Sequence, residues 1–241
     1  MVKSIKMNTV IHRANTRGNA NHGWLNAYHS FSFASWYNAE RLQFGALRVL
    51  NDDTIAAGMG FGTHPHNNME IITIPLEGDL AHKDSMGNTS TIKTGDIQVM
   101  SAGTGVQHSE FNPNTDLPTK LFQIWLFPKA IDVIPRYQQI TLDKSLQKNN
   151  FAQILSPNEL DEGVWIHQDA WFFLSHFEEN FSKNISLQKE GNGFYIITIE
   201  GEIEVNGEKL EKKDAIGIWE TSELGIKATT EAKFLIMEIP M

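Results

Sequence analysis

Short runs of β-branched and aromatic residues, each ended by Gly, Asn or Asp, are the feature that most restricts the fold of this chain. Examples are residues 70–76, 96–100 and 120–127. Such runs are typical of strands bounded by turns. Helical spacing of apolar residues is weak, and residues 156–159 form the main candidate for a helix start. The sequence therefore predicts an all-β protein of the sandwich or barrel type, with few short helices.

The strand pattern occurs twice along the chain. Residues 74–80 read Ile-Pro-Leu-Glu-Gly-Asp-Leu, and residues 197–203 read Ile-Thr-Ile-Glu-Gly-Glu-Ile. A turn and a strand that starts near an acidic residue follow in each half, at Asp96 and at Asp214. Common turn chemistry alone is the simpler alternative. We interpret the pattern as a degenerate internal duplication, which predicts two stacked small barrels.

A polar stretch between residues 128 and 155 separates the two halves. It contains Pro135 and the run 144–150, which interrupt the apolar strands. We therefore predict an N-terminal domain over residues 1–130 and a C-terminal domain over residues 131–241.

The composition excludes several classes of function. The 241 residues include 29 acidic and 20 basic residues, so the formal net charge is -9 and a polyanion such as DNA would be repelled. The chain has no cysteine, which excludes disulfides and thiolate-ligated metals. No stretch approaches the roughly 20 apolar residues of a membrane span, and the N-terminus lacks the pattern of a secretory signal. We expect a cytoplasmic protein without direct nucleic-acid or membrane contacts.

Two pairs of alternating polar residues point to a metal site. His64 and His66 flank Pro65, and about forty residues later His108 and Glu110 flank Ser109. Residues two apart on a strand share a face, so each pair can point into one cavity. Pro65 cannot donate to a sheet ladder, which favours an edge or the start of a strand.

Three imidazoles and one carboxylate form a mixed nitrogen and oxygen site. Such a site suits Fe(II), Mn, Ni, Cu or Zn and leaves positions for water, oxygen or a chelating substrate. Ser109 points to the opposite face from His108, so the two cannot act as nucleophile and base, and a serine hydrolase is excluded.

Other histidines and aromatic residues receive a more conservative interpretation. A lone histidine in a β protein is usually a surface or hydrogen-bonding residue, so four further histidines are assigned no catalytic role. Large aromatic residues at strand spacing are more often core than pocket lining. The histidines are His12, His22, His29 and His82, and the aromatic residues are Trp24, Phe31, Phe33, Trp36, Trp125 and Phe127.

The sequence resembles the pirin family, block after block, over about residues 12 to 128. The blocks include Arg17-Gly18, His22-Gly23-Trp24-Leu25, His29-Ser30-Phe31-Ser32-Phe33, Phe44 to Asp53, His64-Pro65-His66, Met69-Glu70, His82-Lys83-Asp84-Ser85, Gly95 to Gln98, Met100 to Gly105, and His108-Ser109-Glu110-Phe111. The resemblance of the C-terminal half is less specific. It rests mainly on residues 164–170 and on the glycine spacing after Gly193.

The resemblance implies a bicupin fold, two double-stranded β-helix barrels, with one metal in the N-terminal barrel. Its ligands would be His64, His66, His108 and Glu110. Glu70 would not bind the metal itself but would contact these ligands. Iron as Fe(II) is the metal implied first, with Cu, Ni, Co, Mn or Zn as alternatives. In the C-terminal half, positions at matching spacing hold no such ligands, which predicts a degenerate cupin without metal. These positions are Leu187, Lys189, Ile226 and Ala228.

Two functions follow from the resemblance. The first is a quercetin 2,3-dioxygenase-like oxidoreductase, which opens the heterocyclic ring of a flavonol with O2 and uses Glu110 as catalytic proton acceptor. The second is a regulatory metal-binding protein whose redox state controls a protein partner, which the acidic charge favours over DNA. Sugar isomerisation or another oxygenation on the same ligands is a third reading, since fold does not decide reaction. The chain carries no distinctive interface signal, and we lean slightly to a monomer.

Overall fold

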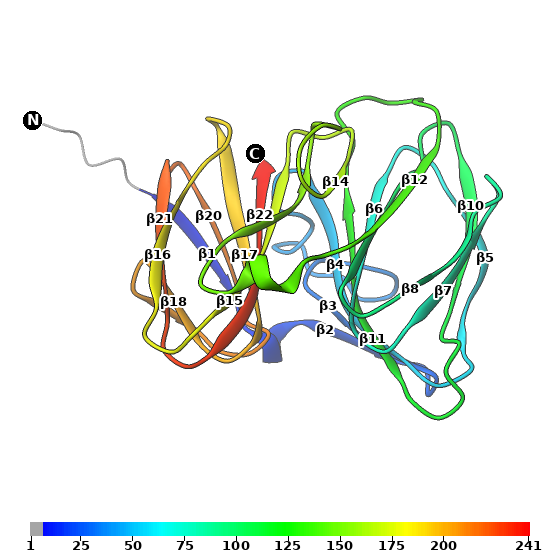
Figure 1. Cartoon of the computed structure of the whole chain (residues 1–241), viewed down its shortest axis with the longest axis horizontal. Helices are drawn as coiled ribbons and strands as arrows, with labels where there is room; N and C mark the ends of the chain where they lie inside the picture. Colours follow the sequence, from blue (N-terminus) through cyan, green and yellow to red (C-terminus); the bar gives the residue numbers. More distant parts are fainter. Residues whose placement is uncertain (1–6) are drawn as a thin grey trace, which may run out of the picture. The chain divides into compact units, whose positions relative to one another are not determined.

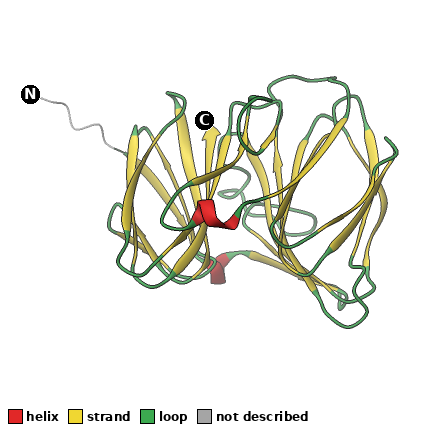
Figure 2. Cartoon of the chain, viewed as in Figure 1, coloured by secondary structure: helices red, strands yellow, loops and turns green. Residues whose placement is uncertain are grey.

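The computed structural model describes residues 7–241, and its strands confirm the all-β prediction (Figures 1 and 2). Within these residues the helices are two short 3₁₀ turns, η1 (Ala14–Thr16) and η2 (Lys144–Gln147). The expected helix start at residues 156–159 is wrong. Strand β13 (Ala152–Ser156) ends there, and the Asn158 side chain accepts a hydrogen bond from the Leu160 N–H at 3.2 Å. This bond stabilises a turn in place of a helix.

The chain forms two compact units. We call residues 18–142 with 157–168 the N-terminal barrel, and residues 7–17, 143–156 and 169–241 the C-terminal barrel. Each barrel has a larger and a smaller antiparallel sheet. Such paired sheets enclose a core between their inner faces.

In the N-terminal barrel the larger sheet has the order β12-β9-β6-β11-β4-β3-β2 and the smaller sheet the order β5-β10-β7-β8. Figure 1 shows β5, β10 and β7 as one wall of this barrel, opposite β6 and β4. The bounds are β2 (Gly18–Asn21), β3 (Leu25–His29), β4 (Leu47–Ile55), β5 (Gly60–His66), β6 (Glu70–Glu77), β7 (Leu80–Asp84), β8 (Thr89–Ile92), β9 (Asp96–Ser101), β10 (Val106–Phe111), β11 (Thr119–Leu126), β12 (Arg136–Thr141) and β14 (Val164–Trp165).

In the C-terminal barrel the larger sheet contains β1-β20-β17-β22-β15-β13 and the smaller sheet has the order β16-β21-β18-β19. Six strands of the larger sheet and all four strands of the smaller sheet follow the same order as in the N-terminal barrel, as the duplication predicts. The bounds are β1 (Asn8–His12), β15 (Trp171–Phe177), β16 (Ser182–Ser186), β17 (Asn192–Glu200), β18 (Ile203–Val205), β19 (Glu208–Leu210), β20 (Ala215–Trp219), β21 (Glu223–Ala228) and β22 (Ala232–Pro240).

The edge strands of the two larger sheets come from unexpected parts of the chain. Strand β1 pairs with β20 of the C-terminal barrel over five residues, and β12 pairs with β9 of the N-terminal barrel over six. In Figure 1 the blue β1 accordingly lies beside the orange β20. The structure therefore differs from a single boundary at residue 130, because sheet pairing assigns each of these strands to the barrel of the other half.

Both barrels have apolar cores. In the C-terminal barrel one large apolar cluster includes Phe194, Ile216, Ile226 and Ala228, so two positions that match metal ligands in spacing are occupied by core residues. In the N-terminal barrel one smaller cluster contains Ile55, and another contains residues of β6, β9 and β10. Polar side chains, among them His82, His108 and Glu110, are also buried in the N-terminal barrel. That the C-terminal barrel holds no metal stays a prediction.

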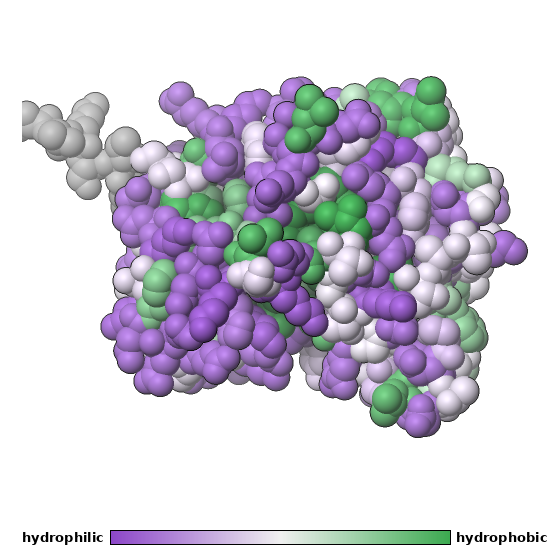
Figure 3. Space-filling view, in the orientation of Figure 1, coloured by the Kyte–Doolittle hydropathy of each residue, from purple (hydrophilic) through white to green (hydrophobic). Residues whose placement is uncertain are grey.

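Hydrophilic residues cover most of the face seen in Figure 3, in keeping with the acidic composition. Within residues 7–241, every helix is too short to cross a membrane.

Candidate metal centre

Strands β5 and β10 bring three histidine side chains together inside the N-terminal barrel. His64 lies directly opposite His108 in the antiparallel pairing, and His66 follows two residues further on the same face. The ring centroids are 4.4 Å apart for His64 and His108, 4.9 Å for His64 and His66, and 4.8 Å for His66 and His108. Pro65 is on β5, an edge strand as expected. The alternation in the sequence therefore has the predicted geometric result for these three residues.

Glu110 lies on the same strand as His108, and a β-bulge separates their pairing with β5. Its side chain is buried and accepts two hydrogen bonds from Gln123 Nε2, both at 3.1 Å. Thr73 Oγ1 lies 3.5 Å from Glu110 Oε1. Potential ligand atoms of Glu110 and His108 lie within 4.8 Å of each other and of His82. His108 therefore belongs to both groups of side chains, one with His64 and His66 and one with His82 and Glu110.

His82 is a neighbour of the site that the sequence did not single out. It pairs with Glu110 across β7 and β10 and is buried at 2% exposure. Its Nε2 atom lies 3.2 Å from Asp84 Oδ2, which orients the ring, and Nδ1 has no hydrogen-bond partner among the described residues. The alternation of His82 with Asp84 on one strand face was the available signal.

The imidazole nitrogens have the state that a divalent metal requires. His66 Nε2 and both ring nitrogens of His108 are buried without a hydrogen-bond partner in the described part of the chain. The His64 ring is oriented through Nδ1, which is 2.8 Å from the Gly62 carbonyl oxygen. Burial and the neighbouring His64 lower the pKa of His66 to about 4, and the same two causes lead in lowering the pKa of His108 to about 2. His66 and His108 are therefore neutral at pH 7, which is the ligand form, and the donor set fits a mixed nitrogen and oxygen metal site.

Without metal, the protein is expected to lose stability as the pH falls from 6.5 to about 4. In this window the unfolded chain protonates His66 at its ordinary pKa of 6.5, whereas the folded protein does so only near 4. Because the unfolded state binds more protons, acid favours unfolding. Urea unfolding in the presence of a chelator, at several pH values, measures the effect. A His66→Gln variant should show a shallower dependence in this window, and an unchanged slope would contradict the prediction.

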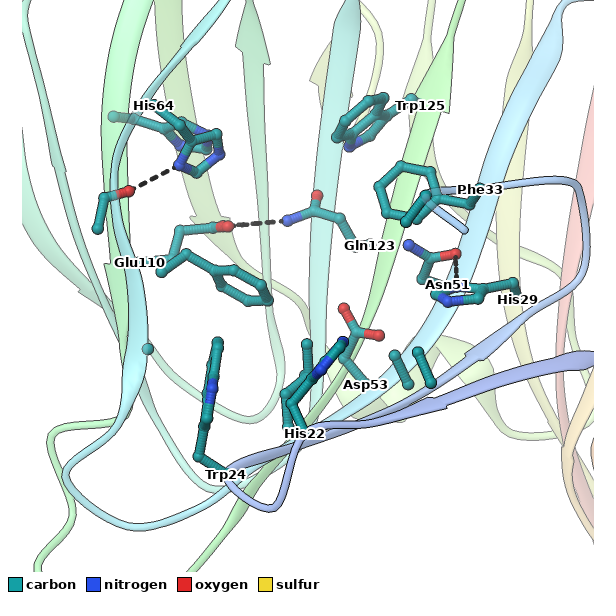
Figure 4. A pocket seen from close by; sticks show the side chains of 18 of the residues that line it. His22, Trp24, His29, Phe33, Asn51, Asp53, His64, Glu110, Gln123 and Trp125 are labelled. Carbon is teal, nitrogen blue, oxygen red and sulfur yellow. Dashed lines mark hydrogen bonds between the residues drawn. The ribbon is translucent and has the colours of Figure 1, made fainter. Parts of the chain in front are cut away.

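A cavity of about 490 Å³ opens beside the histidines (Figure 4). Its walls include Trp24, Phe33, Phe61 and Trp125. Phe33 contacts Trp125 edge to face at 5.4 Å, and Trp24 contacts Phe61 in the same way at 5.2 Å. Cavities of this size and character bind small organic molecules. Three of the aromatic residues that the sequence favoured as core, Trp24, Phe33 and Trp125, thus line the pocket, whereas Phe31 is core as expected.

Polar residues of β4 and β11 also face this cavity. Asn51, Asp53 and Gln123 line it, and all three side chains are buried. Asn51 Oδ1 is 2.8 Å from His29 Nδ1. Sequence reasoning missed these residues, because the polar run Asn51-Asp52-Asp53-Thr54 of β4 does not show which side chains face the inside of the barrel.

Glu70 was expected to support the metal ligands. It is buried at the start of β6, and its Oε2 atom accepts a hydrogen bond from Ser101 at 2.7 Å. Burial raises its pKa to about 7, against the opposing effects of Ser101, Arg136 and the His167 backbone. Glu70 therefore interacts with β9 and with residues after β11, and its support of the metal ligands stays a prediction.

Two barrels of paired antiparallel sheets define a bicupin. One barrel contains converging histidines beside an aromatic pocket, an arrangement that could hold a metal ion. Residues 10–126 match the family model described as Pirin, and residues 153–239 match that of the quercetinase C-terminal cupin domain. A quercetin 2,3-dioxygenase of Escherichia coli (strain K12) is 40% identical over 234 residues, which cover 95% of this chain and 98% of that protein. The chain belongs to the pirin family.

Further relatives agree with this assignment. A pirin-like protein of Caulobacter vibrioides is 37% identical, with 92% of this chain and 95% of that protein covered. The crystal structure of YhhW from Escherichia coli matches with a TM-score of 0.93 at 39% identity, covering 97% of this chain and 98% of that chain. A structure of bacterial pirin YhhW from Escherichia coli in complex with nickel(II) matches with a TM-score of 0.92 at 37% identity, covering 97% and 99%.

Proposed function

We propose that this protein is a metal-dependent dioxygenase that opens the heterocyclic ring of a flavonol with O2. The observation that carries the proposal is the position of three converging imidazoles and a buried carboxyl group beside an aromatic cavity. The names of relatives with about 40% identity, such as the quercetin 2,3-dioxygenase of Escherichia coli, support the same chemistry.

In this proposal His64, His66, His108 and Glu110 hold one divalent metal, with Fe(II) as the native ion. When bound, the metal acts as a Lewis acid that lowers the pKa of an oxygen ligand. The His64 ring is already oriented by the Gly62 carbonyl, and Asp84 orients His82 beside Glu110. Prior orientation of this kind reduces the reorganisation that binding requires.

Glu110 is the proposed acceptor for the proton of the substrate hydroxyl group. Burial raises the pKa of its carboxyl group, which makes the carboxylate a stronger base than an exposed glutamate. Gln123 donates to both carboxylate oxygens and so fixes the direction of the group. The aromatic walls exclude water and offer flat surfaces to a planar ligand.

Turnover of quercetin tests the proposal directly. Protein freed of metal, loaded with Fe(II) and mixed aerobically with quercetin should bleach the flavonol absorption band and release carbon monoxide. The same protein without metal is the control. Absence of turnover with Fe, Mn, Co, Ni, Cu and Zn would contradict the enzymatic proposal and favour regulation of a protein partner through the redox state of the metal.

A further inference from the structure

Asp53 is a buried carboxyl group in the pocket that the proposed chemistry does not use. It lies on β4, lines the cavity and is 4% exposed. Its Oδ1 atom has no hydrogen-bond partner among the described residues. Figure 4 shows the carboxyl group pointing into the pocket, on the side of His22 and away from the labelled His64.

Two neighbouring polar side chains of the pocket wall, Asn51 and Gln123, are hydrogen-bonded to other side chains, whereas Asp53 Oδ1 is not. Asn51 is bonded to His29, and Gln123 is bonded to Glu110. A buried polar atom without a partner destabilises the folded state, and native proteins contain few of them. An unpartnered oxygen at a cavity wall is therefore well placed to bond a ligand.

The protonation state of Asp53 suits such a bond. Burial, followed by the charges of Glu110 and Asp52, raises the pKa of the Asp53 carboxyl group to about 8. Below that pH the group is mainly neutral, so it can both donate and accept a hydrogen bond. A hydroxyl group has the same double capacity, and the two form complementary pairs.

We propose that Asp53 determines substrate specificity by bonding a ring hydroxyl group of a flat aromatic ligand, at a point other than the oxygens that chelate the metal. The inference rests on the proposed function and deepens it. It names the ligand class as a polyhydroxylated aromatic molecule with a chelating pair of oxygens and at least one further phenolic hydroxyl. Trp24 and Phe61, which line the same cavity, supply apolar contact to the ring that carries this hydroxyl.

Binding of two flavonols to the Zn-loaded protein tests the inference without turnover. Quercetin and 3-hydroxyflavone share the chelating 3-hydroxyl and 4-carbonyl groups, but 3-hydroxyflavone lacks the other hydroxyl groups. Dissociation constants are measured by titration calorimetry for the unmodified protein and for Asp53→Leu, which keeps the shape of the side chain without its polar atoms. We expect the unmodified protein to prefer quercetin. The variant should lose about tenfold of that preference while its affinity for 3-hydroxyflavone is unchanged.

The stability of the variant separates a binding role from a structural one. Removal of an unpartnered buried carboxyl group should raise the free energy of unfolding. The gain should increase from pH 4 to pH 8, because over this range the unfolded chain releases the proton of Asp53 and the folded protein retains it. Thr198→Val is the matched control, since Thr198 is a buried hydroxyl without a partner in the described C-terminal barrel. It should leave both flavonol affinities unchanged.

Each other outcome overturns the inference in a recognisable way. An unchanged preference for quercetin in Asp53→Leu would reject the role of Asp53 and leave the proposed function intact. An equal loss of affinity for both flavonols, together with lower stability, would make Asp53 a structural residue. If neither flavonol binds the unmodified Zn-loaded protein, the inference fails, and the turnover assay with the other metals decides separately on the proposed function.

Discussion

Replacement of His108 by alanine is expected to abolish stable metal binding. His108 belongs to both groups of potential ligands, and neither of its ring nitrogens has another partner among the described residues. Loss of an outer hydrogen-bond partner of a ligand costs about 10–100-fold in metal affinity, and loss of the ligand itself should cost more. Metal content after dialysis, measured by mass spectrometry, checks the expectation.

Thermal unfolding provides a second measurement. A metal present at about 1,000 times its dissociation constant stabilises a folded protein by about 4 kcal/mol, and the His108→Ala variant should lack this gain. His176→Ala is the control, because His176 is on the C-terminal barrel and its ring contacts Glu231 at 2.7 Å. Stoichiometric metal in the His108→Ala variant would contradict the prediction, because the ion would then be bound by other residues.

Replacement of Glu110 by glutamine is expected to lower turnover of quercetin by roughly 10²–10⁴-fold, the usual contribution of a general base. The glutamine has nearly the same shape but cannot accept a proton at neutral pH. It also turns one acceptor of the Gln123 amide into a donor, so that hydrogen bond is expected to weaken. Initial rates at saturating Fe(II) and quercetin measure the effect on kcat.

Metal content must be determined for the same samples, because Glu110 is also a proposed ligand. Gln107→Ala is the matched control, since Gln107 is exposed on the same strand and should be neutral in both measurements. A Glu110→Gln variant that retains metal and full turnover would remove the proton role.

The part of the structure that the sequence predicted rests on local periodicity. Alternation on a strand places His64 and His66 on one face, and it does the same for His108 and Glu110, whatever the remaining fold. The repeated Glu-Gly turns were the basis for predicting the duplication. Both turns need glycine, because Gly78 and Gly201 adopt a positive φ, near 76° and 74°. At Gly201 a side chain would also lie 2.1 Å from the Glu231 carbonyl oxygen.

The remainder depends on contacts between distant segments. Gln123 reaches Glu110 only because β11 and β10 lie in facing sheets, and no spacing in the sequence encodes this. Asp53 and the half-buried Asp52 lie on opposite faces of β4. Which of the two faces the inside of the barrel can be told only from the register of the sheet. The origin of the edge strands was likewise hidden, because the residues of β1, Asn8–His12, do not indicate the barrel with which this strand pairs.

The position of β1 has a consequence for how the chain is made. Asn8 and Glu220, 212 positions apart, form a hydrogen bond at 2.6 Å at one end of the pairing of β1 with β20. Strand β1 is therefore synthesised long before its partner β20. Pairings between segments so far apart in the sequence form slowly. Until β1 has paired with β20, the exposed edge of β20 can pair with a strand of another chain. The second barrel can therefore be completed only after residues 215–240, which form β20, β21 and β22, have been synthesised.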